Sequence, residues 1–521
     1  MTVTPKQQIE GSDRDKAEIP EGWTVIRLEE VCTAPQYGWT TSADRSRSGL
    51  KLLRTTDISK GTVDWSTVPG CKNKPDDPTR YLLSPGDIVV SRAGSVGLSY
   101  IVSECPRSIF ASYLIRFRAL PPIESNFIGI YLKSPHYWSG IADVTAGIAT
   151  PNVNASKLRK LQMPLPPLPE QHRIVAKIEE LLARVNTARE RLAKVQEILK
   201  RFRQSVLAAA CSGRLTADWH SENLNFERAE QLLKRVCTKR KEKYKSQCKK
   251  AREEGGKIPK KPANIESNKV DNNELPEIPE GWIWVYLPDI GYINRGKSRH
   301  RPRNALHLYD GPYPFVQTGD IAQSRGRITS HRQTYSEAGL AQSRIWPAGT
   351  VCITIAANIA SSAILTYPAC FPDSVVGVIP DADLCLEEYL EYFVRTARSD
   401  LDQFAPATSQ KNINISILSN VAVPLPPFFE QHEIVRRVET LFELADAIEK
   451  RVAAAKERAE KLTQAILAKA FRGELVPTEA ELASREGRSY EPASALLAKI
   501  KAQRNDAQPQ PKGRRANRKR K

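Results

Sequence analysis

One stretch of the sequence matches the pattern of a phosphate-binding loop. Residues 291–298, Gly-Tyr-Ile-Asn-Arg-Gly-Lys-Ser, fit GxxxxGK[ST], in which backbone N–H groups and the lysine hold nucleotide phosphates. Such a loop must open a helix. Here a basic run containing Pro302 follows, and proline prevents a regular helix at that point. We therefore interpret the stretch as a basic surface loop and not as a nucleotide site.

The other residues with chemical potential do not form catalytic or metal-binding patterns. His172 and His432 each follow Glu-Gln, but no Cys or His stands at ligand spacing from either, so we expect interface or capping roles. The nine cysteines are scattered and include no CxxC pair, which argues against a zinc site or a disulfide framework and is typical of a reducing cytoplasm. Neither the Asn-Pro-Pro-aromatic motif of adenine methyltransferases nor a clear cluster of nuclease carboxylates is present. The sequence predicts no catalytic site and no metal site.

Length and composition favour a multidomain protein with sizeable cores. The 521 residues predict about three or four domains, and a hydrophobic fraction of 40% excludes a fully disordered chain. Residues 1–20 are polar and contain no apolar segment, so no secretory signal is expected. The apolar stretch 351–367 is interrupted by Asn358, Ser361 and Ser362 and is shorter than the ~20 residues of a membrane helix. We interpret it as two buried strands and expect a cytoplasmic protein that does not contact membranes.

The formal net charge of +19 is confined to two segments. Residues 234–261 hold thirteen Lys and Arg against three Asp and Glu, and residues 499–521 hold ten against one. Basic runs of this kind are either solvated and flexible or attract phosphate groups. Net charge therefore supports a polyanionic partner only through these two segments.

The chain contains two copies of one unit. Glu18–Trp23 (Glu-Ile-Pro-Glu-Gly-Trp) recurs at 277–282, and four further matches share a constant shift of 260 residues. These are Asn152–Asn154 with 412–414, Pro164–Pro167 with 424–427, Glu170–His172 with 430–432, and Gly213 and Leu215 with Gly473 and Leu475. The interiors diverge, since residues 37–57 share almost nothing with 294–320. The pattern predicts two domains with one scaffold and different surfaces.

Each copy continues into a predicted long helix with a coiled-coil pattern. Apolar residues alternate at spacings of three and four, which favours pairing of the two helices over packing on their own domains. The predicted seam consists of Ile178, Leu181, Val185, Leu192, Val195 and Leu199 with Val438, Leu441, Ile448, Val452, Leu462 and Ile466. Gly213 and Gly473 are expected to end the helices. Each helix spans roughly 50 Å, and because short connections are preferred, we expect an antiparallel pair with one domain at each end.

The order of the motifs resembles one known family. The motifs are Pro-Glu-Gly-Trp before each domain, residues 53–58 and 83–88, Pro-Leu-Pro-Pro with Glu-Gln-His before each helix, and residues 473–477 and 491–497. In this arrangement the sequence resembles the specificity (S) subunits of Type I restriction–modification enzymes. The resemblance implies an α+β fold in which two target-recognition domains are joined by a long antiparallel two-helix coiled coil, with an internal pseudo-twofold repeat that matches the dyad of duplex DNA.

The resemblance also implies a function and a set of partners. A chain of this family recognises a bipartite, asymmetric double-stranded DNA site and docks two methyltransferase subunits and the restriction or motor subunits. The chain itself is not an enzyme and carries no cofactor. S-adenosylmethionine, ATP and Mg are expected on the partner subunits, and the assembled complex would be a Type I site-specific deoxyribonuclease and adenine-specific DNA methyltransferase that defends against foreign DNA. Two alternatives remain: a non-catalytic coiled-coil scaffolding protein that binds other proteins, and a fused methyltransferase or nuclease, against which the missing motifs argue.

These considerations predict seven segments along the chain. They are a polar N-terminal leader (1–17), target-recognition domain 1 (18–168), coiled-coil helix 1 (169–211), a basic linker with a short helix (212–276), target-recognition domain 2 (277–428), coiled-coil helix 2 (429–472) and a C-terminal segment with a basic tail (473–521).

Candidate DNA-binding residues are the polar and basic side chains of the diverged regions, because base edges are read by hydrogen bonds and phosphates by Lys and Arg. In the first copy they are Tyr37, Thr40, Thr41, Arg45, Arg47, Arg54, Thr55, Thr56, Arg92, Ser95, Asn152 and Asn154. In the second they are Lys297, Ser298, Arg299, His300, Arg301, Arg303, Gln317, Thr318, Ser409, Gln410, Lys411 and Asn412. Singly, each could be a solvated loop residue. Asp57 and Asp320 are alternatively turn caps, and Trp23 and Trp282 are expected to be core anchors of their domains.

Overall fold

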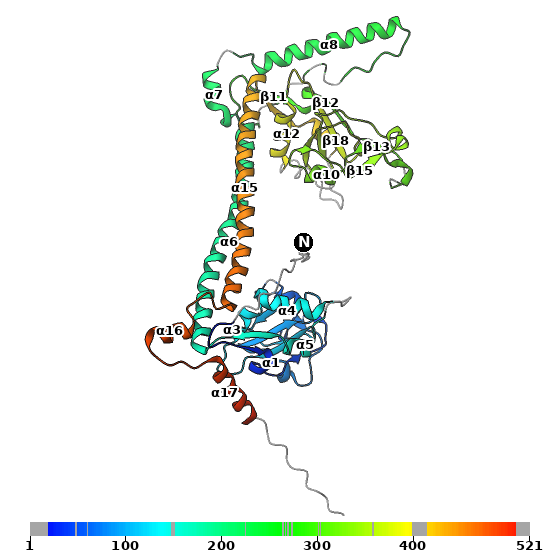
Figure 1. Cartoon of the computed structure of the whole chain (residues 1–521). Coiled ribbons are helices and arrows are strands. Elements are labelled where there is room, and N and C mark those ends of the chain that lie inside the picture. Colours follow the sequence, from blue (N-terminus) through cyan, green and yellow to red (C-terminus); the bar gives the residue numbers. More distant parts are fainter. Residues whose placement is uncertain are drawn as a thin grey trace, which may run out of the picture. The chain divides into compact units, whose positions relative to one another are not determined.

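Two compact units make up the chain, one formed by two separate segments and the other by a continuous segment. The computed structural model describes residues 19–46, 49–59, 61–146, 152–223, 226–262, 265, 267, 270–271, 275–300, 302, 304–356, 359–398 and 414–506. Unit 1 comprises residues 1–192 and 453–521, and unit 2 comprises residues 193–452 (Figure 1). The two long helices are α6 (Leu168–Cys211) and α15 (Phe428–Phe471). Each helix is divided between the two units.

Unit 1 is built around two four-stranded sheets. The first has the order β2 (Gln36–Tyr37), β9 (Leu114–Arg118), β6 (Asp87–Ser91), β7 (Ser99–Ile101), and the second has the order β3 (Ala43–Asp44), β5 (Gly70–Cys71), β4 (Lys51–Leu53), β8 (Ser108–Phe110). A separate pair joins β1 (Thr24–Arg27) and β10 (Gln162–Leu165) in antiparallel register. The helices are α1 (Leu28–Val31), α2 (Thr55–Ile58), α3 (Ser125–Tyr131), α4 (Pro135–Thr145), α5 (Ala155–Arg159), α16 (Glu479–Glu486) and α17 (Ala493–Asp506).

Unit 2 repeats this plan with a larger main sheet. The sheet has the order β12 (Gly291–Arg295), β18 (Val375–Pro380), β16 (Val351–Thr354), β17 (Ser362–Leu365), β14 (Arg327–Ile328). Two pairs accompany it, β11 (Ile283–Tyr286) with β19 (Ala422–Leu425) and β13 (Tyr309–Phe315) with β15 (Gln333–Tyr335). The helices are α7 (Ala217–Glu222), α8 (Ala229–Glu253), α9 (Leu287–Ile290), α10 (Thr318–Gln323), α11 (Glu337–Ala341), α12 (Glu387–Thr396) and α14 (Ile415–Ser419). The two buried strands predicted within residues 351–367 are confirmed as β16 and β17, which pair antiparallel.

The two main sheets share strand order and register although their sequences diverge. The order β2-β9-β6-β7 corresponds to β12-β18-β16-β17. At the end of β6 the buried Ser91 Oγ accepts from Leu98 N at 2.9 Å, and at the end of β16 the buried Thr354 Oγ1 accepts from Ser361 N at 3.0 Å. The same hydroxyl-to-backbone bond thus closes the turn after the strand in both units, so residues of the two copies can be compared position by position.

The long helices pair antiparallel within each unit. In unit 1, Arg189 Nη2 donates to Thr463 Oγ1 at 3.2 Å, and Arg173, earlier in α6, lies 2.7 Å from Glu479, which follows α15. In unit 2, Arg203 Nη2 lies 2.6 Å from Asp446 and 3.1 Å from Glu449. The predicted α+β fold, with two similar domains and two long antiparallel helices packed together, is confirmed.

Most residues of the predicted seam are buried or half-buried, but Leu462 is not. Leu462 is 52% exposed, so its assignment to the seam is wrong. Arg189 of α6 donates to Ala459 O and to Thr463 Oγ1 at 3.2 Å each, so polar contacts replace an apolar one at this level. The exposed Leu462 therefore adds no buried apolar contact to the helix pair at this level.

Glycines end both helices, as predicted. Gly213 and Gly473 have φ of 74° and 75°, in the left-handed region that glycine adopts without strain. Any side chain would also clash, because a Cβ at Gly213 would lie 2.2 Å from Pro279 and one at Gly473 would lie 2.4 Å from Pro20. Each glycine therefore brings the chain after the helix against the Pro-Glu-Gly-Trp segment of its unit.

The segments after the long helices dock in the same way. The backbone N–H of Ala229 in α8 donates to Gly281 O at 2.9 Å, and that of Ala493 in α17 donates to Gly22 O at 2.9 Å. Behind these bonds, Leu232 and Val236 of α8 and Leu496 and Ile500 of α17 are buried in the core of their units. This repeat, whose shift is 264 residues, was not predicted from the sequence. Among the described residues, no helix is both long and apolar enough to cross a membrane.

Candidate nucleic-acid interface

The two motifs that both copies share meet in each unit and fix the start of the long helix. In unit 1, Trp23 Nε1 donates to Glu170 Oε1 at 3.0 Å, and Glu479 N donates to Glu170 Oε2 at 2.9 Å. Glu170 is fully buried. Burial raises its pKa above the usual value, and the bonds from Glu479 N and Trp23 oppose that shift in part.

In unit 2 the buried carboxylate of Glu430 accepts the equivalent hydrogen bonds from partly different donors. We call the Trp–Glu hydrogen bond at the start of each long helix a lock. Trp282 Nε1 donates to Glu430 Oε2 at 2.9 Å, Thr216 Oγ1 donates to Glu430 Oε1 at 2.8 Å, and His220 Nδ1 lies 3.0 Å from Glu430 Oε2. Trp23 and Trp282 are 8% and 5% exposed, so their prediction as core anchors is confirmed. Their indole N–H groups also tie each domain to its helix, and the surfaces described below are held on this frame.

In unit 1, three separate predicted DNA-binding segments come together beside the edge strand β2. The Arg92 guanidinium carbon lies 5.0 Å from the centre of the Tyr37 ring, a cation–π distance. Val153 N donates to Arg92 O at 3.0 Å, and Ala155 N donates to Tyr37 Oη at 3.0 Å. The segment that holds Asn152 therefore lies directly against Arg92 and Tyr37.

Polar atoms at this cluster remain without partners. Within the part of the chain that the structure describes, Arg92 Nε and Asn152 Oδ1 are buried and have no hydrogen-bond partner. Buried polar groups are normally bonded, so such atoms call for an explanation such as an absent ligand. Asn154, in contrast, caps α5 by accepting from Lys157 N at 2.8 Å, and Ser95 is exposed in the turn after β6.

The remaining candidates of unit 1 belong to the second sheet and to α2. Arg54 donates to Asp57 with its backbone N at 2.8 Å, and the two side chains form an ion pair at 2.7 Å, so Asp57 is a helix cap. Thr55 and Thr56 open α2, and the buried Thr55 Oγ1 has no hydrogen-bond partner among the residues that the structure describes. Thr41 Oγ1 accepts from Asn73 N at 3.1 Å, while Thr40 and Arg45 are exposed. Arg47 lies outside the described residues.

In unit 2, the predicted basic loop is hydrogen-bonded to the chain after α11. We call its residues 297–300 the strap. Gln342 Oε1 accepts from Arg299 N at 2.6 Å and from His300 N at 3.0 Å, and Ser343 Oγ donates to Lys297 O at 2.9 Å. The side chains of Lys297 and Arg299 are exposed, whereas Ser298 is 8% exposed and its hydroxyl bonds the buried Tyr335. A buried side chain cannot reach a base edge, so Ser298 does not suit direct contact.

The strap is not a nucleotide-binding loop. Residues 291–295 form strand β12, and the described residues that follow adopt no helix before the short 3₁₀ turn Leu306–Leu308. The helix that the phosphate-loop pattern requires does not follow. The candidates Arg301, Arg303, Ser409, Gln410, Lys411 and Asn412 lie outside the described residues.

Beside the strap, Arg344 is held between two aromatic rings, a feature that the sequence did not predict. Arg344 Nη1 donates to Tyr292 Oη at 2.7 Å, and its guanidinium carbon lies 4.8 Å from the Tyr292 ring and 4.3 Å from the Trp346 ring. Asn294 Nδ2 donates to the same Tyr292 oxygen at 2.7 Å. No local sequence signal marked Arg344, because only the fold brings it from the chain after α11 to the edge strand β12.

Gln317 and Thr318 start α10, as Arg54 and Thr55 start α2. Asp320 Oδ2 accepts from Gln317 N at 2.9 Å, so this aspartate is also a helix cap. The Gln317 amide donates to Gln333 Oε1. Asp57 and Asp320 thus have the capping role that was predicted as the alternative to DNA contact.

His172 and His432, at the starts of the long helices, lie next to an acidic and an aromatic side chain, respectively. His172 Nε2 lies 3.4 Å from Glu124 at the surface, and the His432 ring packs edge-on against Phe428 with the centroids 5.0 Å apart. Among the described residues, no three His, Cys, Asp or Glu side chains group as a metal site would need.

Comparisons with known proteins agree with this arrangement. The family described as "Type I restriction modification DNA specificity domain" matches residues 20–197 and again residues 279–457. The chain belongs to this family. The two matches start in the Pro-Glu-Gly-Trp segments and reach into the long helices, so the internal repeat is the repeat of the family domain. The chain is the DNA specificity subunit of a Type I restriction–modification system, which is a non-catalytic subunit.

Relatives match nearly the whole specificity subunit. The Type I restriction enzyme EcoKI specificity subunit of Escherichia coli strain K12 is 31% identical, with 93% of this chain and 96% of that protein covered. The EcoBI specificity subunit of Escherichia coli is 29% identical, with 96% of each covered. A solved chain from a study of complex assembly and conformational transition of the type I R-M system has a TM-score of 0.61 at 22% identity, with 88% of this chain and 100% of that chain covered, and shows the same fold.

Proposed function

We propose that this specificity subunit recognises a bipartite, asymmetric double-stranded DNA site, with one half read by each target-recognition domain. The domains are residues 18–168 and 277–428, and the helices 169–211 and 429–472 set the spacing between the half-sites. The remaining segments are the leader 1–17, the linker 212–276 and the segment 473–521.

One observation carries the proposal. Each unit stacks an arginine on a tyrosine of the edge strand of its main sheet, Arg92 on Tyr37 and Arg344 on Tyr292. The two arginines do not occupy equivalent positions. The position of unit 2 that corresponds to Arg92 is occupied by Ile355. The two residues make the same backbone hydrogen bond, because Arg92 N donates to Tyr113 O and Ile355 N donates to Ser374 O, at 2.9 Å each. One scaffold therefore presents different recognition chemistry in its two copies, which is what an asymmetric site requires.

The chemistry of these side chains suits base edges in the major groove. Arginine bonds guanine O6 and N7 in a bidentate manner, and asparagine bonds adenine N6 and N7. In unit 1 we assign base contacts to Arg92 and Asn152, and in unit 2 to Arg344. The remaining exposed candidates, including Lys297, Arg299, Thr40 and Arg45, are assigned to phosphate or flanking contacts, which set position and not sequence.

The partners follow from the relatives. These are named as specificity subunits of Type I restriction enzymes, and the solved neighbour comes from work on assembly of the type I complex. We infer that this chain docks two methyltransferase subunits and the restriction or motor subunits in the cytoplasm. S-adenosylmethionine, ATP and Mg belong to those partners.

Methylome sequencing of the host tests the proposal. A split motif with methylated adenine in both halves should be present, and it should vanish when the gene for this chain is deleted. A methylome unchanged by the deletion would contradict the proposal and favour the alternative, a scaffolding protein that binds only other proteins.

A further inference from the structure

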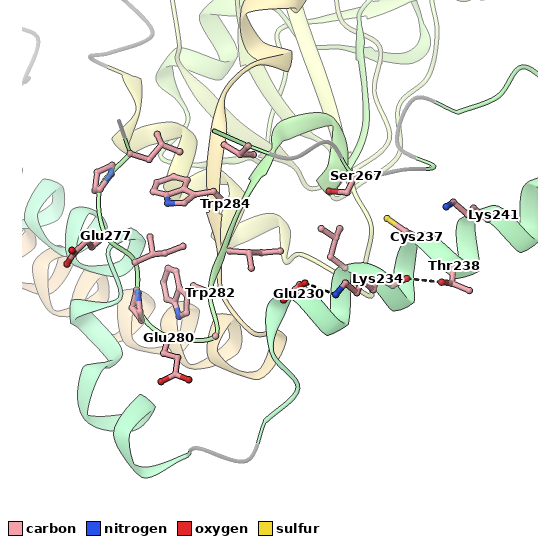
Figure 2. A pocket seen from close by; sticks show the side chains of 18 residues that line it. Glu230, Lys234, Cys237, Thr238, Lys241, Ser267, Glu277, Glu280, Trp282 and Trp284 are labelled. Atoms are coloured by element: carbon pink, nitrogen blue, oxygen red, sulfur yellow. Dashed lines mark hydrogen bonds and ion pairs between the residues drawn. The ribbon is translucent and has the colours of Figure 1, made fainter. Parts of the chain in front are cut away.

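Helix α8 has two parts with different roles. Its first part is docked: Ala229, Leu232, Leu233 and Val236 are buried in unit 2. Arg240 ends this part, with Nη1 donating to Asp289 O at 2.8 Å and Nε donating to Asp381 at 3.0 Å. Figure 2 shows Lys234, Cys237 and Thr238 along α8, with Trp282 and Trp284 on the chain segment across from them. These residues line a groove of about 1140 Å³.

The second part of α8 has no packing role. Beyond Arg240 the helix continues to Glu253 and contributes no buried side chain to unit 2. Figure 1 shows α8 running away from the strands of its unit. We call residues 241–262 the basic arm. It contains nine Lys and Arg against three Glu.

The arm returns along its own helix, which fixes its shape. Tyr244 Oη lies 3.2 Å from Pro259 O, so the segment after the helix runs back beside it. Lys245, Lys249 and Arg252 line the resulting groove of about 490 Å³, with Glu253 as its one acidic and Ile258 as its one aliphatic side chain among the described lining residues. Their spacing of four and three residues puts these three cations on one helical face.

We propose that the basic arm binds the phosphate backbone of duplex DNA that flanks the half-site of unit 2. The inference rests on the proposed duplex binding by that unit and adds a contact outside the recognition domain. Lys245 and Arg252 are separated by about 10 Å along the helix, the axial rise of about three nucleotides of one strand. The exposed lysine stems are free to place their charges on successive phosphates, and these contacts carry no sequence preference.

Charge decides between DNA and a protein partner. Lys249 and Lys250 are 81% and 75% exposed and lie 3.9 Å from Glu253 and 3.8 Å from Glu254, respectively. Because solvent screens such long, exposed ion pairs, they offset little of the positive charge of the arm. The arm has Ile258 as its exposed large apolar residue, at 49%, whereas stable protein interfaces bury an apolar centre. A surface with much charge and little apolar area fits a polyanion.

The test measures binding of the full chain to a duplex of random sequence at several salt concentrations. The triple variant Lys245→Gln, Lys249→Gln, Arg252→Gln keeps good helix formers in α8. Each lost phosphate contact lowers the slope of log affinity against log salt by about 0.9, so we expect a decrease of about 2 to 3 and an affinity lower by about tenfold at low salt. The charge-conserving variant Lys245→Arg, Lys249→Arg, Arg252→Lys should bind as the native chain does.

A matched control removes three exposed cations elsewhere. Lys194→Gln, Lys200→Gln, Arg201→Gln on α6 should leave the slope unchanged, and circular dichroism should show equal helix content in both triple variants. An arm variant with the native slope would overturn the inference. So would a variant that keeps the slope but loses binding to the methyltransferase subunits, because the arm would then contact protein. The methylome reports base preference separately, so it tests the proposed function without depending on the arm.

Discussion

At the scale of residues, the two proposed recognition surfaces have one feature in common, an arginine stacked on a tyrosine. Arg92 is held over Tyr37 while its Nε stays without a partner among the described residues. Arg344 is held over Tyr292 and Trp346. Stacking fixes the plane of the guanidinium, and a fixed plane lets the remaining N–H groups meet a base edge without a further loss of freedom.

We predict that Arg92→Gln relaxes base preference in one half of the target and that Arg344→Gln relaxes it in the other half. Each change removes a bidentate contact, which is worth about 1–3 kcal/mol of discrimination at one base pair. Competition binding with duplexes altered one base pair at a time measures the effect. Lys160→Gln, at the exposed end of α5, is the control and should leave every base preference intact. Relaxation of both halves by a single variant would show that the two surfaces are not independent.

At the scale of elements, the proposed spacer role of the helices requires that the start of each helix stays fixed to its domain. Trp23 with Glu170 and Trp282 with Glu430 provide these locks, far from the middle of the pair. Residues 193–199 and 451–457 lie between the contacts of Arg189 and those of Arg203. These middle segments can therefore be shortened without touching a lock.

We predict that deleting residues 193–199 and 451–457 together shortens the preferred gap and leaves both half-sites unchanged. One heptad from each helix removes about 10 Å, the rise of about three base pairs, and keeps the seam in phase. The gap length in the methylome of a strain carrying the variant measures the outcome. Ile198→Ala, at an exposed position of the same segment, should keep the native gap. New bases in either half would contradict a spacer role.

The sequence could predict elements whose signal is local and could not predict contacts made by the fold. Spacing alone located both long helices, and the interrupted apolar run located β16 and β17. Leu462 was misassigned because a heptad pattern does not reveal that Arg189 bonds Thr463. The match of α8 with α17 was missed because the shift changes from 260 to 264 after the helices. The pairing of Arg344 with Tyr292 joins residues 52 apart, and no local pattern encodes it.

At the scale of the whole molecule, each unit is completed by chain from the other copy of the repeat. The segment after α6 docks on the second domain, and the segment after α15 docks on the first, each through a backbone bond from an alanine to the glycine of Pro-Glu-Gly-Trp. Arg437 of α15 adds an ion pair with Asp218 at 2.6 Å, which lowers the pKa of Asp218 to about 2. The two backbone bonds lie on the shared Pro-Glu-Gly-Trp motifs, so the diverged loops can change while these contacts stay the same.

We predict that replacing residues 277–428 by the matching domain of another specificity subunit changes one half of the recognised site and leaves the other half and the gap as they are. The graft must keep Gly281 for the bond from Ala229, and Trp282 for the bond to Glu430, because both bonds cross its boundary. Restriction of the change to one half follows because the Arg92 cluster of unit 1 contains no residue of the graft. Methylome sequencing of a strain with the chimaera measures both halves at once. The reciprocal replacement of residues 18–168, with Gly22 and Trp23 kept, should change the opposite half, and a change in both halves from either graft would mean that the two domains read DNA jointly.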